Sequence, residues 1–237
     1  MPTELLTVRD LHAYYGKSHV LQGVSLTVRP GEVVGLLGRN GVGKTTTLKA
    51  IMGLITRRGQ VVFKSTEVSS LPAHQIPRLG IGYVPQGRHI FPEFTVWENL
   101  MVGLVKEKTA PPERLDAVFR NFPVLGERLK QLGGTLSGGE QQMLAIARAV
   151  ISQPALILMD EPSEGLSPLT RGIVLDRIKT IQASGVGILL VEQNVKLALA
   201  TCQRVYFMEK GVVRQEVEAA VLQKDKELVA RYLGVEM

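Results

Sequence analysis

Cysteine and long apolar runs are scarce in this chain. It has 237 residues and one cysteine, Cys202, so an internal disulfide cannot form, and no histidine or acidic residue is spaced from Cys202 as a metal ligand would be. No apolar run approaches the roughly 18 residues that a membrane-spanning helix needs, and the start, Met1 to Glu4, lacks the charged and apolar parts of a signal peptide. We therefore expect a cytosolic protein that does not itself cross a membrane, with Cys202 as a plain buried or half-buried thiol.

Long basic tracts and aromatic residues are also lacking. The chain carries 28 Lys and Arg against 22 Asp and Glu, and the formal charge of +6 is compatible with an anionic ligand, a membrane surface or no specific partner. The longest basic cluster is Arg57 with Arg58, and no basic run alternates with aromatic residues as a nucleic-acid-binding surface would. Nucleic acid is therefore not expected as a partner.

A glycine-rich segment lies between a strand and a helix near the N-terminus. The apolar run Val33–Leu37 predicts a buried strand, and apolar residues at helical spacing between Leu48 and Ile55 predict the helix. The segment fits the P-loop, in which backbone N–H groups surround a nucleotide's phosphates, the lysine reaches the outer phosphates and the threonine contacts Mg²⁺. An ordinary glycine-rich turn would not explain Lys44 and Thr45. The residues expected to bind nucleotide are Gly38, Arg39, Asn40, Gly41, Val42, Gly43, Lys44, Thr45 and Thr46.

The middle of the chain, from about residue 88 to residue 152, reads as a mostly helical insert between sheet strands. Thr95 and Glu98 form a capping-box sequence at one helix start, and another helix is expected after Pro111 and Pro112. The insert ends with a second glycine-containing motif, at residues 137–140.

Ser137-Gly138-Gly139-Glu140 also has the form of a capping box before an apolar helical stripe. A plain helix cap would account for the serine and the glutamate. It would not account for two adjacent glycines, which cost stability in a helix and are useful where another backbone or a phosphate must come close. Because a helix N-terminus attracts anions, we expect Ser137, Gly138 and Gly139 to form a second phosphate contact.

Two acidic residues follow the apolar run Ala155–Met159, which predicts a buried parallel strand. Ligands of open α/β sheets bind at the carboxyl ends of strands, and two unpaired acids there would be costly without a cation. A solvated turn is the alternative, but a P-loop needs an acid for Mg²⁺, and this is the Walker B position. Asp160 is expected to hold Mg²⁺ directly or through water, and Glu161 to activate the attacking water as general base.

Together these motifs resemble the ATP-binding subunit of an ABC transporter, and the run Leu136–Gln141 is close to diagnostic of that family. The resemblance covers nearly the whole chain. It implies an α/β fold and one ABC ATPase domain over residues 1–237. A P-loop NTPase (RecA-like) core with an N-terminal antiparallel β part would span about residues 4–87 and 153–237, and a helical subdomain about residues 88–152. It also implies that two such domains pack head to tail, so that each ATP, with its Mg²⁺, lies between one subunit's P-loop and the other's Ser-Gly-Gly segment.

Further roles are implied by single positions that match the family. Tyr15 resembles the aromatic residue that stacks on adenine, although a tyrosine near a strand end is as often ordinary packing. Gln86 matches the glutamine that contacts Mg²⁺. Two positions depart from the common pattern: Gln193 stands where many relatives have a histidine, and Ser167 where an aspartate is usual. A glutamine amide can donate a hydrogen bond but cannot carry a proton, so a catalytic role for Gln193 must be positional, which strengthens Glu161 as the base.

The subtype resemblance is to one of the two ATPase subunits of bacterial importers for branched-chain amino acids. It rests on the segments Val191–Asn194, Glu161–Leu166 and Arg231–Gly234. Importers of urea and short amides belong to the same family, and Val84–Arg88 occurs in both branches. The implied partners are a second ATPase subunit, identical or different, the membrane permease subunits and, indirectly, a periplasmic solute-binding protein. The implied location is peripheral, on the cytoplasmic side of the inner membrane.

Resemblance also suggests where the permease docks. In related transporters a short permease helix sits in a groove beside the glutamine loop, here Gly87–Phe94. Phe91, Phe94 or Trp97 is expected to form an exposed aromatic anchor there. Burial in the helical insert is the alternative, above all for Trp97.

Other classes of ATPase fit less well. Chromosome-organising relatives insert a long coiled coil, whereas only about 90 residues separate Lys44 from Ser137 and no heptads are sustained between them. Translation-linked relatives normally carry two cassettes. A non-transport ABC ATPase remains the alternative, and a non-catalytic nucleotide-binding module is disfavoured by Lys44, Asp160 and Glu161.

Overall fold

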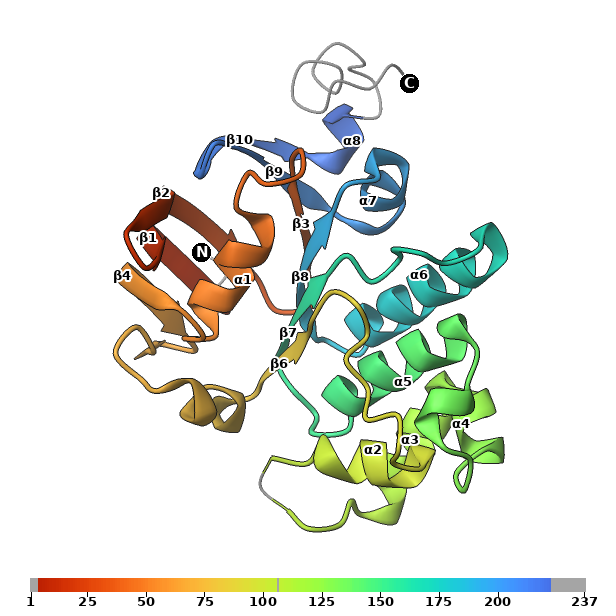
Figure 1. Ribbon diagram of the computed structural model, residues 1–237. Helices are drawn as coiled ribbons and strands as arrows, with labels where there is room; N and C mark the ends of the chain where they lie inside the picture. Colours follow the sequence, from red (N-terminus) through yellow and green to blue (C-terminus); the bar gives the residue numbers. More distant parts are fainter. Residues whose placement is uncertain (1–3, 106, 223–237) are drawn as a thin grey trace.

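The computed structural model describes residues 4–105 and 107–222 (Figure 1). The segment Arg231–Gly234, part of the subtype resemblance, lies outside these residues. Among the described residues, no helix is both long enough and apolar enough to cross a membrane.

A six-stranded, largely parallel sheet forms the centre of the molecule. Strands β3, β7 and β8 are buried along their whole length because helices or the second sheet cover both faces. Edge strand β10 is antiparallel to β9. In spatial order the strands are β10 (Val212–Glu218), β9 (Arg204–Glu209), β3 (Val33–Leu37), β8 (Gly187–Glu192), β7 (Leu156–Asp160) and β6 (Ile81–Val84).

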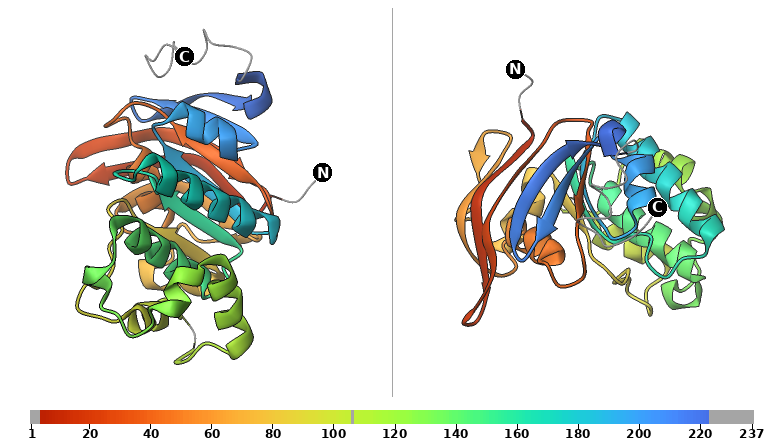
Figure 2. Two further views of the ribbon diagram at one scale, coloured as in Figure 1. Left: turned by 90° about the vertical axis from the view of Figure 1, so that its right-hand side faces the viewer. Right: turned by 90° about the horizontal axis from the view of Figure 1, so that it is seen from above.

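A second, antiparallel sheet faces the first, and the two enclose helix α1 (Lys44–Ile51), as Figure 2 shows in its right-hand view. Val24, Leu26 and Val28 point into the shared core, as their alternation with polar residues predicts. In spatial order its strands are β2 (Ser18–Val28), β1 (Leu6–Tyr15), β4 (Thr56–Phe63) and β5 (Thr66–Glu67). The α/β fold with an N-terminal antiparallel part is thus confirmed.

Helices cover the other face of the central sheet and gather beside β6 (Figure 1). The Thr95–Glu98 capping box forms at the start of α2, as predicted. The helices of this group are α2 (Val96–Val102), α3 (Pro112–Asn121), α4 (Pro123–Glu127), α5 (Gly138–Val150), α6 (Pro168–Ala183) and α7 (Val195–Thr201). The shorter helices are η1 (Ala73–Gln75), η2 (Pro77–Leu79), η3 (Gly133–Thr135) and α8 (Ala219–Leu222).

Helix α1 is shorter than its apolar pattern predicts. It ends at Ile51, because Gly53 takes a left-handed conformation with φ of 68° and turns the chain away. Ile55 still packs against the core from outside the helix. Cys202 follows α7 and is buried, as expected.

Candidate active site

The glycine-rich loop connects β3 to α1 in a path that side chains would block. A Cβ on Gly38 would lie 2.5 Å from the carbonyl oxygen of Met208. Gly43, the N-cap of α1, has φ of 111°, a conformation that other residues adopt at a cost. The loop therefore brings bare backbone to the N-terminus of α1, where the helix dipole favours an anion.

Lys44, the first residue of α1, lies back along this loop. Its Nζ donates to the carbonyl oxygens of Gly38 at 2.9 Å and Arg39 at 3.1 Å, and lies 3.6 Å from Oε1 of Glu161. Burial lowers the pKa of Lys44, while the charge of Glu161 opposes that shift. A buried ammonium held by neutral carbonyls is suited to exchange them for phosphate oxygens.

Asp160 lies at the carboxyl end of β7, beside α1. Its Oδ1 accepts a hydrogen bond from Oγ1 of Thr45 at 3.1 Å, while Oδ2 is buried without a hydrogen-bond partner among the described residues. Burial raises the pKa of Asp160, the Thr45 bond opposes this, and the charge of Glu161 adds to it. Nε2 of Gln86, in the loop after the neighbouring strand β6, donates to Oε2 of Glu164 at 2.8 Å. Carboxylate, hydroxyl and amide oxygens are a set of ligands that fits Mg²⁺. A cation or its bound water would give the unpartnered Oδ2 of Asp160 a partner.

Glu161 follows Asp160 in a strained conformation and is oriented by Gln193. Its φ is 46°, in the left-handed region, and its backbone N–H donates to Val191 at 3.0 Å. Nε2 of Gln193 lies 2.8 Å and 2.6 Å from the two carboxylate oxygens of Glu161. The structure thus brings both predicted catalytic residues into contact, with the amide able to orient the carboxylate but not to take its proton.

A third carboxylate lies next to this pair and was missed by the sequence analysis. Glu192, 3% exposed at the end of β8, accepts a hydrogen bond from Oγ of Ser163 at 2.7 Å. Burial raises the pKa of Glu192, the Ser163 bond opposes this, and the charge of Glu161 adds to it. An acid directly after the apolar run of β8 was the signal available in the sequence. The Ser163 bond ties the loop after Glu161 to the loop that carries Gln193.

The residues around Lys44 enclose a cavity of about 300 Å³. Gly38, Arg39 and Val42 belong to the same loop but do not line it, and Tyr15 lies outside it, 45% exposed at the end of β1. The lining residues are Asn40, Gly41, Gly43, Lys44, Thr45, Thr46, Gln86, Glu161, Glu164 and Gln193.

The second glycine motif begins α5 as a capping box. Oγ of Ser137 accepts from the backbone of Glu140 at 3.4 Å, and Oε2 of Glu140 accepts from the backbone of Ser137 at 2.8 Å. This part of the sequence pattern is confirmed.

The two glycines of that motif have neighbours within the chain. A Cβ on Gly138 would lie 2.9 Å from the guanidinium of Arg88, and a Cβ on Gly139 would lie 2.2 Å from Cγ2 of Thr170. The short Thr170 side chain therefore disfavours any side chain at position 139, whereas the flexible end of Arg88 can move away from position 138. None of the described residues that line the Lys44 cavity belongs to this motif, so a single copy does not bring its two glycine motifs to one site.

Ser167, the departure from the usual aspartate, caps α6. Its Oγ accepts from the backbone N–H of Thr170 at 3.3 Å and shares a hydrogen bond with Oγ1 of Thr170 at 2.9 Å. Serine performs this capping role as well as aspartate does.

Comparison with known proteins agrees with this geometry. The sequence model of the family described as ABC transporter matches residues 21–164. The chain belongs to the ABC transporter ATPase family. It is 42% identical to the high-affinity branched-chain amino acid transport ATP-binding protein BraG of Pseudomonas aeruginosa, over 97% of this chain and 100% of BraG. It is 37% identical to the lipopolysaccharide export system ATP-binding protein LptB of Haemophilus influenzae, over 97% of each chain.

A solved structure of an ABC ATPase is also similar. It is a dimeric, post-hydrolysis ATP-binding cassette bound to ADP and phosphate, with a TM-score of 0.79 and 25% identity over 90% of this chain and 98% of that one. As a member of the family, this chain is an ATP-binding ATPase subunit of a transporter. ABC ATPases of this kind work as dimers with membrane permease subunits.

Proposed function

We propose that this ABC ATPase powers an importer of branched-chain amino acids, as a peripheral subunit on the cytoplasmic side of the inner membrane. The similarity to BraG over the full length of both proteins carries the proposal. LptB is 37% identical over a similar length, so the competing hypothesis is that the chain serves an exporter of another cargo. Among importers, the alternative cargo is urea or a short amide. The cargo would reach the permease from a periplasmic solute-binding protein, and nucleic acid is not a proposed partner.

The cargo is tested by reconstitution. Proteoliposomes would hold this chain, its permease subunits, an identical or different second ATPase subunit, and the solute-binding protein of the same transporter. We expect leucine, isoleucine and valine to stimulate ATP hydrolysis. Stimulation by urea or acetamide, or by lipopolysaccharide in their place, would move the proposal to the competing cargo.

In the proposed reaction, ATP occupies the cavity at Lys44, with its adenine on Tyr15. Lys44 would exchange its carbonyl partners for phosphate oxygens, and Thr45, Asp160 and Gln86 would hold Mg²⁺. When bound, Mg²⁺ supplies positive charge that offsets the charge developing on the phosphate oxygens. Glu161 accepts a proton from the attacking water, and Gln193 keeps the Glu161 carboxylate in position.

A second ATPase subunit, identical or different, would complete this site with its Ser137, Gly138 and Gly139 segment. This arrangement is supported by the described lining of the Lys44 cavity, which includes no residue of that segment from the same copy. Loss of the γ-phosphate would remove the bridge between the two halves and let them separate.

The variant Glu161→Gln tests both the base and the dimer. The substitution replaces the carboxylate by an amide of similar shape, which cannot accept the proton of the attacking water. We therefore expect turnover to be lost, while ATP-driven dimerisation persists in size-exclusion chromatography. Ser137→Arg in the same background should prevent the ATP-driven dimer. Normal turnover of Glu161→Gln would remove the assigned base, and an ATP-driven dimer of the double variant would remove the assigned signature contact.

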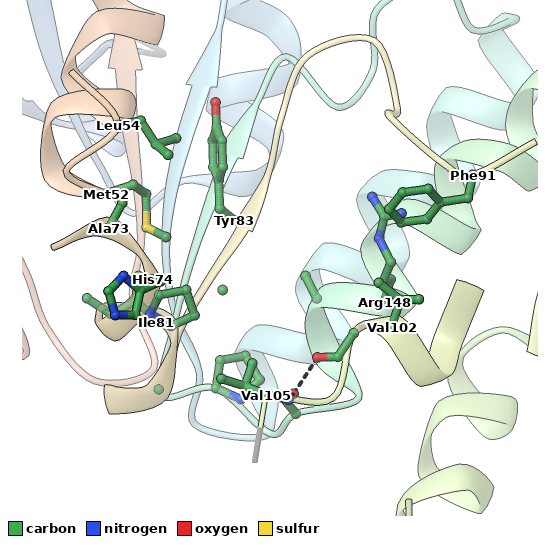
Figure 3. Close-up of a pocket in the computed structure, with 17 residues that line it drawn as sticks. Met52, Leu54, Ala73, His74, Ile81, Tyr83, Phe91, Val102, Val105 and Arg148 are labelled. Carbon is green, nitrogen blue, oxygen red and sulfur yellow. Dashed lines mark hydrogen bonds between the residues drawn. The ribbon is translucent and has the colours of Figure 1, made fainter. Parts of the chain in front are cut away.

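The permease is proposed to dock in a groove of about 590 Å³ between the central sheet and the helical segment of about residues 88–152, which we propose to act as a subdomain. Figure 3 shows its walls: Met52 and Ile81 from the core on one side, Phe91 and Arg148 on the other. The walls are largely apolar, which suits a short permease helix.

Of the three aromatic residues considered as anchors, Phe91 lines the groove and is 42% exposed. Its ring lies 5.2 Å from the guanidinium carbon of Arg148 and stacks on Phe94. Trp97 is half-buried and does not line the groove.

Phe91→Ala is expected to weaken permease association and permease-coupled ATP hydrolysis, and to leave hydrolysis by the isolated subunit unchanged. Leu132→Ala is the matched control, because Leu132 is 43% exposed but lies outside the groove. Equal permease binding by the two variants in a pull-down would contradict the docking proposal.

A further inference from the structure

Tyr83 stands on β6 beside the strand that carries Asp160. Tyr83 pairs with Leu158 of β7 in the parallel register, and Asp160 lies two residues further along β7. Side chains alternate along a strand, so Leu158 and Asp160 share one face of the sheet. Tyr83 and Leu158 both pack in the core that includes α1, so the tyrosine is on that same face. The strand register therefore places Tyr83 diagonally next to Asp160.

Two oxygen atoms in this region are buried without a hydrogen-bond partner among the described residues: Oη of Tyr83 and Oδ2 of Asp160. Buried polar groups are almost always satisfied, so each such atom calls for an explanation. A phenol is protonated at neutral pH and can donate a hydrogen bond, while a carboxylate oxygen can only accept one.

The ring of Tyr83 also has a defined direction. It lines the groove described above, and Figure 3 shows its hydroxyl directed away from His74 and Ile81. Asp160 meets Thr45 at the carboxyl end of β7, the strand next to β6.

We propose that Tyr83 is a positioning residue of the magnesium site: its hydroxyl and the free oxygen of Asp160, which do not bond each other directly in this structure, would be joined through a water when Mg²⁺ is bound. The inference rests on the proposed role of Asp160 as a magnesium ligand and adds a residue outside the ligand set. Hydrogen bonds to a metal-binding carboxylate orient it and stabilise its negative charge, so their loss weakens metal binding.

The test compares two tyrosine-to-phenylalanine variants, each in a Glu161→Gln background that stops turnover. Tyr83→Phe removes the unpartnered hydroxyl and keeps the ring. Tyr206→Phe is the matched control, because its hydroxyl bonds Arg204 at 2.8 Å and the backbone of Thr27 at 3.1 Å, in a network separate from the cavity. Binding of ATP is measured by calorimetry over a series of free Mg²⁺ concentrations and in EDTA.

We expect Tyr83→Phe to raise the half-saturating Mg²⁺ concentration about tenfold, in the range found for residues that support metal ligands. Its ATP affinity in EDTA should match the parent. Tyr206→Phe should leave the Mg²⁺ curve in place and lower the thermal unfolding temperature instead. Melting curves of every variant show that each is folded.

Three outcomes overturn the inference, and Asp160→Asn separates them from failure of the proposed site. If Tyr83→Phe follows the parent curve while Asp160→Asn is shifted, Tyr83 has no role and the magnesium site stands. If neither variant is shifted, the assignment of Asp160 fails as well. If Tyr83→Phe weakens ATP equally with and without Mg²⁺, the tyrosine acts through the nucleotide pocket and not through the metal.

Discussion

Three carboxylates, Asp160, Glu161 and Glu192, lie close to the buried cation Lys44 at the end of the central strands. The charge of Glu161 contributes to the raised pKa of both Asp160 and Glu192, after burial as the larger cause. An acid whose pKa is raised on folding binds its proton more tightly in the folded state. The free energy of unfolding therefore falls as pH rises from the unfolded value, near 4, through the raised one, and the penalty is complete when the folded carboxyl is ionised.

The first prediction follows from this fall in the free energy of unfolding as pH rises. Asp160→Asn, without nucleotide or Mg²⁺, should raise the unfolding temperature at pH 7, because the amide can still accept from Thr45 and no longer carries a buried charge. Each kcal/mol gained corresponds to about 2–4 °C for a chain of this size. The gain should vanish near pH 3, where the parent carboxyl is protonated. Calorimetric melts between pH 3 and 8 check this, and a lower melting temperature at pH 7 would contradict it.

The second prediction concerns the neutral amide of Gln193. Gln193→Ala should lower kcat about ten- to hundredfold, the rate equivalent of losing a hydrogen bond to a charged group worth about 1.5–3 kcal/mol. KM for ATP should change little, because the amide acts on Glu161. Gln193→His should restore part of the rate and add an ionisation near the ordinary histidine pKa, about 6.5, to the pH profile of kcat. The same loss in kcat/KM with unchanged kcat would contradict a positioning role.

At the scale of elements, the contact between α5 and α6 depends on the absence of a side chain at Gly139. The third prediction is that Gly139→Ala destabilises the fold by about 1–3 kcal/mol, because the new methyl meets Cγ2 of Thr170. Thr170→Ser removes that methyl and keeps the hydroxyl that bonds Ser167. A double-mutant cycle in urea should therefore show the penalty largely removed in the double variant. Additive costs would mean that the clash is not the cause.

Local elements were predictable because their causes are local. The capping boxes at Thr95 and Ser137 formed as predicted, since both partners lie within one helical turn. The predicted end of α1 was wrong because Gly53 turns the chain away from the helix, although the apolar pattern continues past it.

The parts of the site that the sequence did not predict depend on neighbouring strands. Ser163 and Glu192 are 29 residues apart and meet only because β7 and β8 pair. The diagonal placement of Tyr83 and Asp160 likewise follows from the register of β6 on β7, which no periodicity in either strand encodes.

At the scale of the molecule, one buried network joins the two sheets. Arg204 of β9 donates to Glu32 at 2.9 Å, to the hydroxyl of Tyr206 at 2.8 Å and to the backbone of Thr27 in β2 at 3.1 Å, and it also pairs with Glu216. Burial alone would raise the pKa of Glu32, but the hydrogen bonds from Arg204 and from the backbone of Arg29, together with the charges of both arginines, lower it. One guanidinium thus contacts residues of both sheets, beside the apolar core that they share.

The fourth prediction compares this network with a surface pair. Arg204→Met should cost about 3–5 kcal/mol of unfolding free energy, because it leaves Glu32 buried without its cation. Arg114→Met, which breaks the Arg114–Glu107 pair at 2.7 Å, should cost less than about 1 kcal/mol. Urea unfolding measures both, and equal costs would contradict a special role for the network.

The groove in Figure 3 shares none of its described lining residues with the cavity at Lys44, and its walls are mostly hydrocarbon. Such a surface is selected by shape and fit, with few hydrogen bonds to dictate a particular partner. Under the proposed docking, a few substitutions in the groove would let the ATPase subunit couple to a different permease while the residues that hydrolyse ATP stay the same.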